Sequence, residues 1–138
     1  MSGEFVDTNI LVYAHDAGAG RKREIASSLL LRLLEEKSGR LSVQVLMEFY
    51  TTVTKKIAAP LSSGKASEIV SDLTTWQAYA PVAMDVLKAI EISEGYKISF
   101  WDAMIVRAAS ALGASVIWSE DLKDGRVYEG VIVKNPFL

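Results

Sequence analysis

The stretch FWDAMIVRAASALGASVIW, residues 100–118, decides the expected fold because it leads from a helix directly into a buried strand. Apolar residues recur with helical spacing over residues 100–112, which predicts a helix there. Gly113 ends this helix, since glycine readily adopts the left-handed conformation found at helix C-termini. Residues 115–118 are short, apolar and β-branched, as expected for a strand inside a sheet.

The rest of the chain repeats this alternation of short β-type runs and longer helical runs. Further strands are expected at residues 4–6, 41–43, 79–82 and 131–133. Helices are expected from residue 10 onward and at residues 23–37, 44–57, 63–76 and 84–94. Strands separated by helices imply crossover connections and a parallel sheet covered on both faces. The predicted fold class is therefore α/β, with a central, mostly parallel sheet of about five strands.

The composition is that of a globular protein. With 138 residues, the chain is expected to form a single domain over residues 1–138. The net charge is −2, whereas a protein that binds nucleic acid by bulk charge is usually strongly basic. Any nucleic-acid binding must therefore depend on locally placed basic groups and bound cations. No apolar run approaches the length of a membrane span, so we expect a soluble, cytoplasmic protein with no membrane association.

The residues available for binding a metal are restricted to oxygen donors. The chain has no cysteine, which excludes disulfides and thiolate sites, and its single histidine, His15, cannot support a zinc site alone. A metal site would therefore be built from carboxylates. Oxygen ligands favour Mg²⁺ or Mn²⁺ over zinc or copper.

Two acids follow predicted strands. Asp7 comes directly after residues 4–6, and Asp121 follows residues 115–118 after two intervening residues. In an open parallel sheet, ligands bind just beyond the carboxyl ends of the strands, so both acids are expected at that edge. An aspartate after a strand is also common as a turn or N-cap residue, and this alternative stays open for each acid taken alone.

Two more acids lie at the edges of helical apolar faces. At about 100° per residue, Glu48 falls about 60° outside the apolar arc of its helix, so it either covers apolar surface or faces a site. Asp102 also stands at the edge of its apolar face. The spacing from Ser99 to Asp102 is that of a capping box, in which Asp102 would bond the Ser99 backbone. A capping role and a metal-binding role are compatible for an acid in the first turn.

The joint placement of these acids predicts a cation site. Each pair of carboxylates about 4 Å apart costs roughly 1–4 kcal/mol through repulsion, so the cluster would not help a metal-free fold. A divalent cation that takes carboxylate oxygens would relieve the repulsion. It would also neutralise a phosphate and activate a water, which gives such a cluster a use in phosphodiester hydrolysis.

Four segments in order resemble the four motifs of PIN domains, in particular those of VapC-type toxins from bacterial and archaeal toxin–antitoxin pairs. These segments are residues 5–13 (FVDTNILVY), 42–49 (SVQVLMEF), 99–103 (SFWDA) and 119–122 (SEDL). The ending, residues 130–137, is also similar to that branch. The resemblance therefore runs over nearly the whole chain.

The resemblance implies a fold, a chemistry and a set of partners. It implies a three-layer α/β/α arrangement with the acids at one pole, and Mg²⁺- or Mn²⁺-dependent cleavage of RNA. It also implies a homodimer that is inhibited by a cognate antitoxin protein. By motif, the metal ligands would be Asp7, Glu48, Asp102 and Asp121. The groups supporting them would be Thr8, Asn9 and Ser119.

Other polar and aromatic residues have weaker claims to a function. His15 is expected at the surface or as a helix cap, and the basic run of residues 21–23 at a solvated helix start. Phe100 and Trp101 could stack on RNA bases, but burial in the core or a dimer contact is the preferred interpretation. Lys97 and Arg107 could contact substrate or face solvent. Glu120 and Asp124 are expected in a polar loop.

Two alternative functions are weighed against the nuclease. An aspartate-based phosphatase or phosphotransfer domain is also α/β with an acid after a strand, but Asn9 stands where a phosphatase would have its second acid. A non-catalytic module that binds RNA or protein fits the near-neutral charge. The presence of all four motif acids favours the enzyme.

Overall fold

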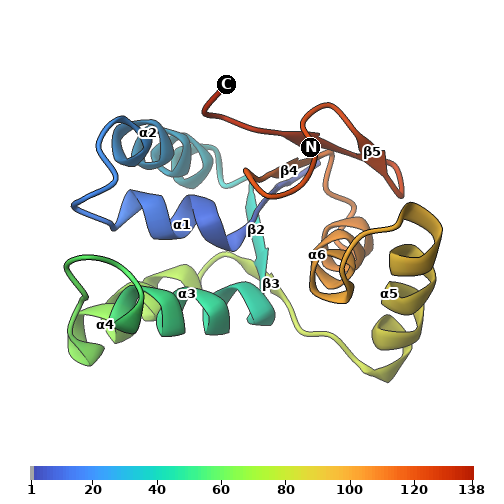
Figure 1. Ribbon diagram of the computed structural model, residues 1–138, viewed down its shortest axis with the longest axis horizontal. Helices are drawn as coiled ribbons and strands as arrows, with labels where there is room; N and C mark the ends of the chain where they lie inside the picture. Colours follow the sequence, from blue (N-terminus) through green and yellow to red (C-terminus); the bar gives the residue numbers. More distant parts are fainter. Residues whose placement is uncertain (1) are drawn as a thin grey trace.

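A computed structural model describes residues 2–138 and shows helices alternating with strands (Figure 1). The helices are α1 Thr8–Ala14, α2 Arg21–Glu36, α3 Val43–Lys55, α4 Ser63–Leu73, α5 Ala83–Tyr96 and α6 Phe100–Ala111. The strands are β1 Glu4–Val6, β2 Gly39–Ser42, β3 Gln77–Tyr79, β4 Val116–Trp118, β5 Val127–Tyr128 and β6 Val131–Lys134. The predicted α/β class is confirmed.

The strands form one sheet in the order β3-β2-β1-β4-β6-β5. The pairs from β3 through β6 are parallel, and only β5 runs antiparallel to its neighbour β6. In Figure 1, α1, α2, α3 and α4 cover one face of the sheet, while α5 and α6 cover the other. This is the three-layer arrangement that the alternating pattern predicts.

The core lies where the central strands meet both helical layers. Phe5 and Val6 of β1, Leu41 of β2 and Ile117 of β4 are all fully buried. Side chains alternate between the two faces of a strand, so a strand buried on both faces consists of consecutive apolar residues. This explains the consecutive apolar residues of β1 and β4, whereas β2 has only Leu41 as a large apolar residue.

Several element boundaries differ from the sequence prediction, among them that of β2, which spans Gly39–Ser42 instead of residues 41–43. A strand was expected at residues 79–82, but β3 ends at Tyr79, because Pro81 has no N–H to donate and the Val82 N–H instead donates to Asp85. The sheet also has a sixth strand, β5, where about five strands were expected in total. The helix expected to end at residue 76 ends at Leu73.

The parallel order places the carboxyl ends of β1, β2 and β4 at one edge of the sheet. Asp7 follows β1, and its backbone N–H donates to the Trp118 carbonyl at the end of β4 (2.9 Å). Ser42 ends β2 and caps α3 through its hydroxyl, which accepts from the Val45 N–H.

Within residues 2–138, no helix is both long and apolar enough to cross a bilayer.

Candidate active site

Asp7 is the most buried of the four predicted acids, with 4 % of its surface exposed. It is the N-cap of α1 and accepts a hydrogen bond from the Thr8 N–H (2.7 Å). Its second oxygen accepts from the Ser119 hydroxyl (2.7 Å) and from the Asn9 amide (3.4 Å). Every one of these donors is a neutral group.

Glu48 reaches the same edge from α3. Its Oε1 accepts from the Thr8 hydroxyl (2.8 Å), so Thr8 bonds both Asp7 and Glu48. Its Oε2 accepts from Nε2 of Gln44 one turn earlier (3.3 Å). Gln44 also donates to the Trp101 carbonyl (3.3 Å), which connects α3 to the start of α6. Glu48 is half-buried, as its position at the edge of the apolar arc predicts.

Asp121 and Asp102 complete the group. Asp121 follows β4, and its Oδ2 accepts from the Asn9 amide (3.2 Å), so Asn9 joins Asp121 to Asp7. Asp102 lies in the first turn of α6, where its N–H donates to the Ser99 hydroxyl (3.1 Å). This is one bond of a capping box; the other bond, from the Ser99 N–H to the Asp102 side chain, was expected from the sequence but does not form among the described residues.

Asp7 and Asp102 each lie close enough to other acids of the group for those charges to raise their pKa values. Burial, together with the charges of Asp121 and Asp102, raises the pKa of Asp7 to about 7, although the Ser119 and Thr8 hydrogen bonds oppose this. Burial also raises the pKa of Asp102, with further contributions from the charges of Asp121 and Glu48. The negative charge at this edge is therefore only partly compensated by the protein.

The donor set suits a hard divalent cation, since it consists of carboxylate oxygens with hydroxyl and amide groups behind them. Among residues 2–138, however, no three acidic or histidine side chains stand in an arrangement that could hold an ion without moving. Binding of one ion by all four acids would require side-chain rotation. Asp121 is exposed and Glu48 is half-buried, which leaves both side chains room to rotate.

A groove of about 400 Å³ opens onto this edge between α1 and α3. Glu48 and Asp121 lie in its wall, together with Tyr13 and the basic side chain of Lys56. The groove therefore offers an open approach to two of the acids. Lys56 would bring a cation close to any phosphate that entered.

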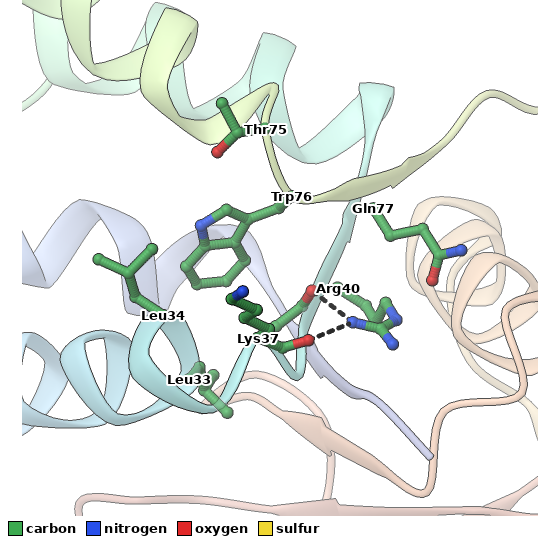
Figure 2. Close-up of a pocket in the computed structure, with 8 residues that line it drawn as sticks. Leu33, Leu34, Lys37, Arg40, Thr75, Trp76 and Gln77 are labelled. Atoms are coloured by element: carbon green, nitrogen blue, oxygen red, sulfur yellow. Dashed lines mark hydrogen bonds between the residues drawn. The ribbon is translucent and has the colours of Figure 1, made fainter. Parts of the chain in front are cut away.

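A larger hollow of about 610 Å³ lies at the opposite edge of the sheet, where β2 and β3 begin (Figure 2). The Trp76 ring packs directly on Gly39, at which a Cβ atom would lie 2.2 Å from the ring. Arg40 donates to the carbonyls of Gly39 (3.0 Å) and Lys37 (3.3 Å). None of the four acids lines this hollow, so its size alone does not make it the candidate site.

The structure also places the residues with weaker claims. Trp101 is 62 % exposed, so the interpretation that it is buried in the core is wrong. His15 caps α1 and bonds the Leu11 carbonyl (2.9 Å), in agreement with the cap prediction. Arg107 neither faces solvent freely nor points to the acids, because it pairs with Asp85 (2.7 Å).

Sequence reasoning missed Gln44, which is buried and hydrogen-bonded to Glu48. Its position four residues before Glu48 is a signal that could have identified it, since side chains with this spacing meet on one face of a helix. Sequence reasoning also missed that Tyr13 and Lys22 bond the Glu120 carboxylate. It named Lys22 only within the basic run of residues 21–23 at a solvated helix start, and no local pattern points to Tyr13.

Comparison with known proteins identifies the family. The sequence profile of the PIN domain matches residues 5–129. The chain belongs to the PIN domain family. The matched residues include all four motif acids. A search of curated protein sequences finds no match to this PIN domain.

Solved structures share the fold of this PIN domain at low sequence identity. VapC20 of Mycobacterium tuberculosis, described as a toxin that cleaves the sarcin–ricin loop, has 20 % identity and a TM-score of 0.65, with 86 % of this chain and 90 % of that chain covered. A toxin–antitoxin complex from Klebsiella pneumoniae has 22 % identity and a TM-score of 0.68, with 98 % of both chains covered. VapBC2 of Rickettsia felis, bound to promoter DNA, has 20 % identity and a TM-score of 0.66, covering 96 % and 97 %.

Proposed function

We propose that this PIN domain is a metal-dependent endoribonuclease and the toxin of a toxin–antitoxin pair. Asp7, Glu48, Asp102 and Asp121 would hold Mg²⁺ or Mn²⁺ and position the attacking water. The VapC20 relative supports the nuclease assignment, because its description is that of an RNA-cleaving toxin. The whole chain, residues 1–138, would act as a single domain.

The observation that best supports the proposal is which acids form an ion pair with a basic side chain and which do not. Within the part of the chain that the structure describes, ion pairs form at Glu4, Glu36, Glu68, Asp85, Glu91 and Glu120. None of them includes any of the four predicted ligands. A buried carboxylate without a cation is costly, and a divalent ion would supply the missing charge.

The chain's own groups would orient the acids. Thr8 donates to both Asp7 and Glu48, and Asn9 donates to both Asp7 and Asp121. The Ser119 hydroxyl holds the second oxygen of Asp7. A bound cation supplies neutralisation of the phosphate and a lowered pKa of its coordinated water. The neutral donors hold the carboxylates at one edge of the sheet, from which Glu48 and Asp121 can rotate toward the ion, and they do not compete with that cation for charge.

The partners would be RNA and an antitoxin protein, with a homodimer as the expected assembly. The relative from Klebsiella pneumoniae is described as a toxin–antitoxin complex, and the one from Rickettsia felis as VapBC2 bound to promoter DNA. An apolar groove of about 450 Å³, lined by Leu46, Met47, Tyr50 and Val70, adjoins the groove that holds Glu48 and Asp121, since Thr51 lines both. An apolar antitoxin segment lying in this groove would end beside the acids.

RNA cleavage tests the proposal. Purified protein should cut RNA in Mg²⁺ or Mn²⁺ and stop when EDTA removes the ion. Asp7→Asn should abolish cleavage while leaving the fold intact. Asp72→Asn, on the exposed side of α4, removes the same charge far from the site and should have no effect. The proposal is wrong if several RNA classes stay intact in both metals, or if Asp7→Asn cleaves like the unmodified protein.

A further inference from the structure

Glu120 lies between two residues of the candidate site, yet its side chain takes no part in the acid group. Ser119 donates to Asp7, and Asp121 accepts from Asn9. The Glu120 carboxylate instead accepts from the Tyr13 hydroxyl (2.5 Å) and from the Lys22 ammonium group. Three consecutive side chains are thus divided between two separate hydrogen-bond networks.

The ion pair between Lys22 and Glu120 is supported by further contacts of the Lys22 ammonium group. The Lys22 ammonium lies 4.9 Å from the centre of the Tyr13 ring and 5.4 Å from that of Phe137. The two rings pack edge to face at 5.3 Å. Exposed ion pairs contribute little by themselves, but a cation held over two packed rings has its position fixed. Tyr13, Lys22 and Glu120 form what we call the Glu120 cluster.

The Glu120 backbone connects this cluster to the acids. Its N–H donates to the Asn9 side-chain oxygen (3.1 Å). This bond fixes which way the Asn9 amide faces, so its NH₂ group must point to Asp7 (3.4 Å) and Asp121 (3.2 Å). Holding Glu120 therefore holds both the orientation of Asn9 and the loop that carries Asp121.

We propose that the Glu120 cluster positions Asp121 and Asn9 and thereby sets the affinity of the site for its divalent cation. This inference rests on the proposed function, because it assumes that Asp121 is a metal ligand. Tyr13, Lys22 and Glu120 are positioning residues that do not themselves touch the ion. Groups behind metal ligands commonly change metal affinity by about 10–100-fold, and the Glu120 cluster is one step further out.

Direct Mn²⁺ binding, measured from the electron paramagnetic resonance signal of the free ion, tests this without any RNA. Lys22→Met should raise the Mn²⁺ dissociation constant about threefold to tenfold. If Lys22 acted only through its charge, Lys22→Met would instead lower the Mn²⁺ dissociation constant, since losing a nearby positive charge favours cation binding. Arg23→Met, an exposed change one residue along α2, is the matched control and should not weaken binding. Lys22→Arg should bind nearly as well as the unmodified protein.

Two results would overturn the inference. An unchanged dissociation constant in Lys22→Met would show that Asp121 does not depend on the Glu120 cluster. A tighter one would show that losing the Lys22 charge outweighs any positioning of Asp121 by the Glu120 cluster. If Lys22→Met does not fold, Tyr13→Phe provides the same comparison, because it removes only the hydroxyl that donates to Glu120.

Asp121→Asn separates this inference from the proposed function. If Asp121→Asn binds Mn²⁺ like the unmodified protein, the proposed metal site itself is wrong. If Asp121→Asn loses binding while Lys22→Met and Tyr13→Phe retain it in full, only the role of the Glu120 cluster is wrong.

Discussion

Replacing Asp7 by asparagine should stabilise the metal-free protein at pH 8 while removing its activity. Asp7 is almost completely buried, and burial together with nearby carboxylates raises its pKa to about 7. The folded protein therefore binds this proton more tightly than the unfolded chain does. Ionising Asp7 consumes folding free energy, and an asparagine at the same place has no charge to desolvate.

The magnitude follows from the two pKa values. A change of the Asp7 pKa from its ordinary value of 3.8 to about 7 corresponds to at most about 4 kcal/mol of destabilisation above pH 7. Asparagine would place an NH₂ group against the Ser119 hydroxyl or the Asn9 amide, which removes hydrogen bonds worth about 1–2 kcal/mol. The net gain is about 2 kcal/mol at pH 8.

The sign of this effect changes with pH. The unmodified protein loses stability as the pH rises from about 4 to about 7, because the folded state holds a proton that the unfolded state has released. Below about pH 4 both states hold it, so only the lost hydrogen bonds remain and Asp7→Asn should be the less stable protein. Above about pH 7 the advantage of the variant should be constant.

Urea unfolding in EDTA at several pH values from 4 to 8 measures this difference. Asp72→Asn, which removes an exposed carboxylate, is the matched control. A difference between Asp7→Asn and the unmodified protein that stays constant over this range would refute the reasoning, as would a less stable variant at pH 8. Mg²⁺ should then stabilise the unmodified protein far more than the variant, since a ligand stabilises only a state that binds it.

Two further substitutions test the packing. Asp85→Asn should lower the free energy of unfolding by about 3–5 kcal/mol in urea titrations, because it leaves Arg107 without its buried partner. The reasoning is wrong if Arg107→Met loses as much stability and the two losses simply add in the double variant. Gly39→Ala should cost about 1–3 kcal/mol and change the Trp76 fluorescence, because its Cβ would lie 2.2 Å from the ring. Gly64→Ala, whose Cβ meets nothing within 4 Å, is the control and should not destabilise.

The parts of the fold that sequence reasoning predicted well depend on local signals. The apolar run of β4 and the helix that Gly113 ends lie close to where the sequence places them. The strand β5 was missed because it has only two residues, Val127 and Tyr128. It turns back to Val131 through Glu129 and Gly130, both with positive φ. A two-residue hairpin of this kind is usually signalled by Asn-Gly or Asp-Gly, and Glu-Gly gives only half of that signal.

The positions of the four acids were predictable, but their hydrogen-bond partners were not. Asp7 and Asp121 follow from the rule that sites form beyond the carboxyl ends of parallel strands. Glu48 and Asp102 follow from helical periodicity. The orientation of Glu120, in contrast, depends on Tyr13 and Lys22, which precede it by 107 and 98 residues. Such a contact depends on packing between distant elements and leaves no trace in the local pattern.

Two buried aspartates show why burial alone does not identify a site. Asp7 and Asp85 are 4 % and 1 % exposed, and each accepts a backbone hydrogen bond at the start of a helix. Burial acts to raise the pKa of both. For Asp85 the Val82 N–H, Arg107 and the Tyr79 hydroxyl more than offset burial and leave the pKa below its usual value. For Asp7 the donors are neutral and the neighbouring charges are carboxylates, so the pKa rises.

The same residue type therefore has opposite electrostatic roles in the two places. Asp85 already has its counter-charge within the fold and contributes to stability, whereas the charge on Asp7 remains uncompensated until something outside the chain supplies it. The sequence shows an aspartate near a helix start in both cases. What separates them is whether a basic residue from another element, here Arg107 from α6, reaches the carboxylate. The absence of an ion pair at Asp7, within the residues that the structure describes, is thus the feature that ties the fold to the proposed cation chemistry.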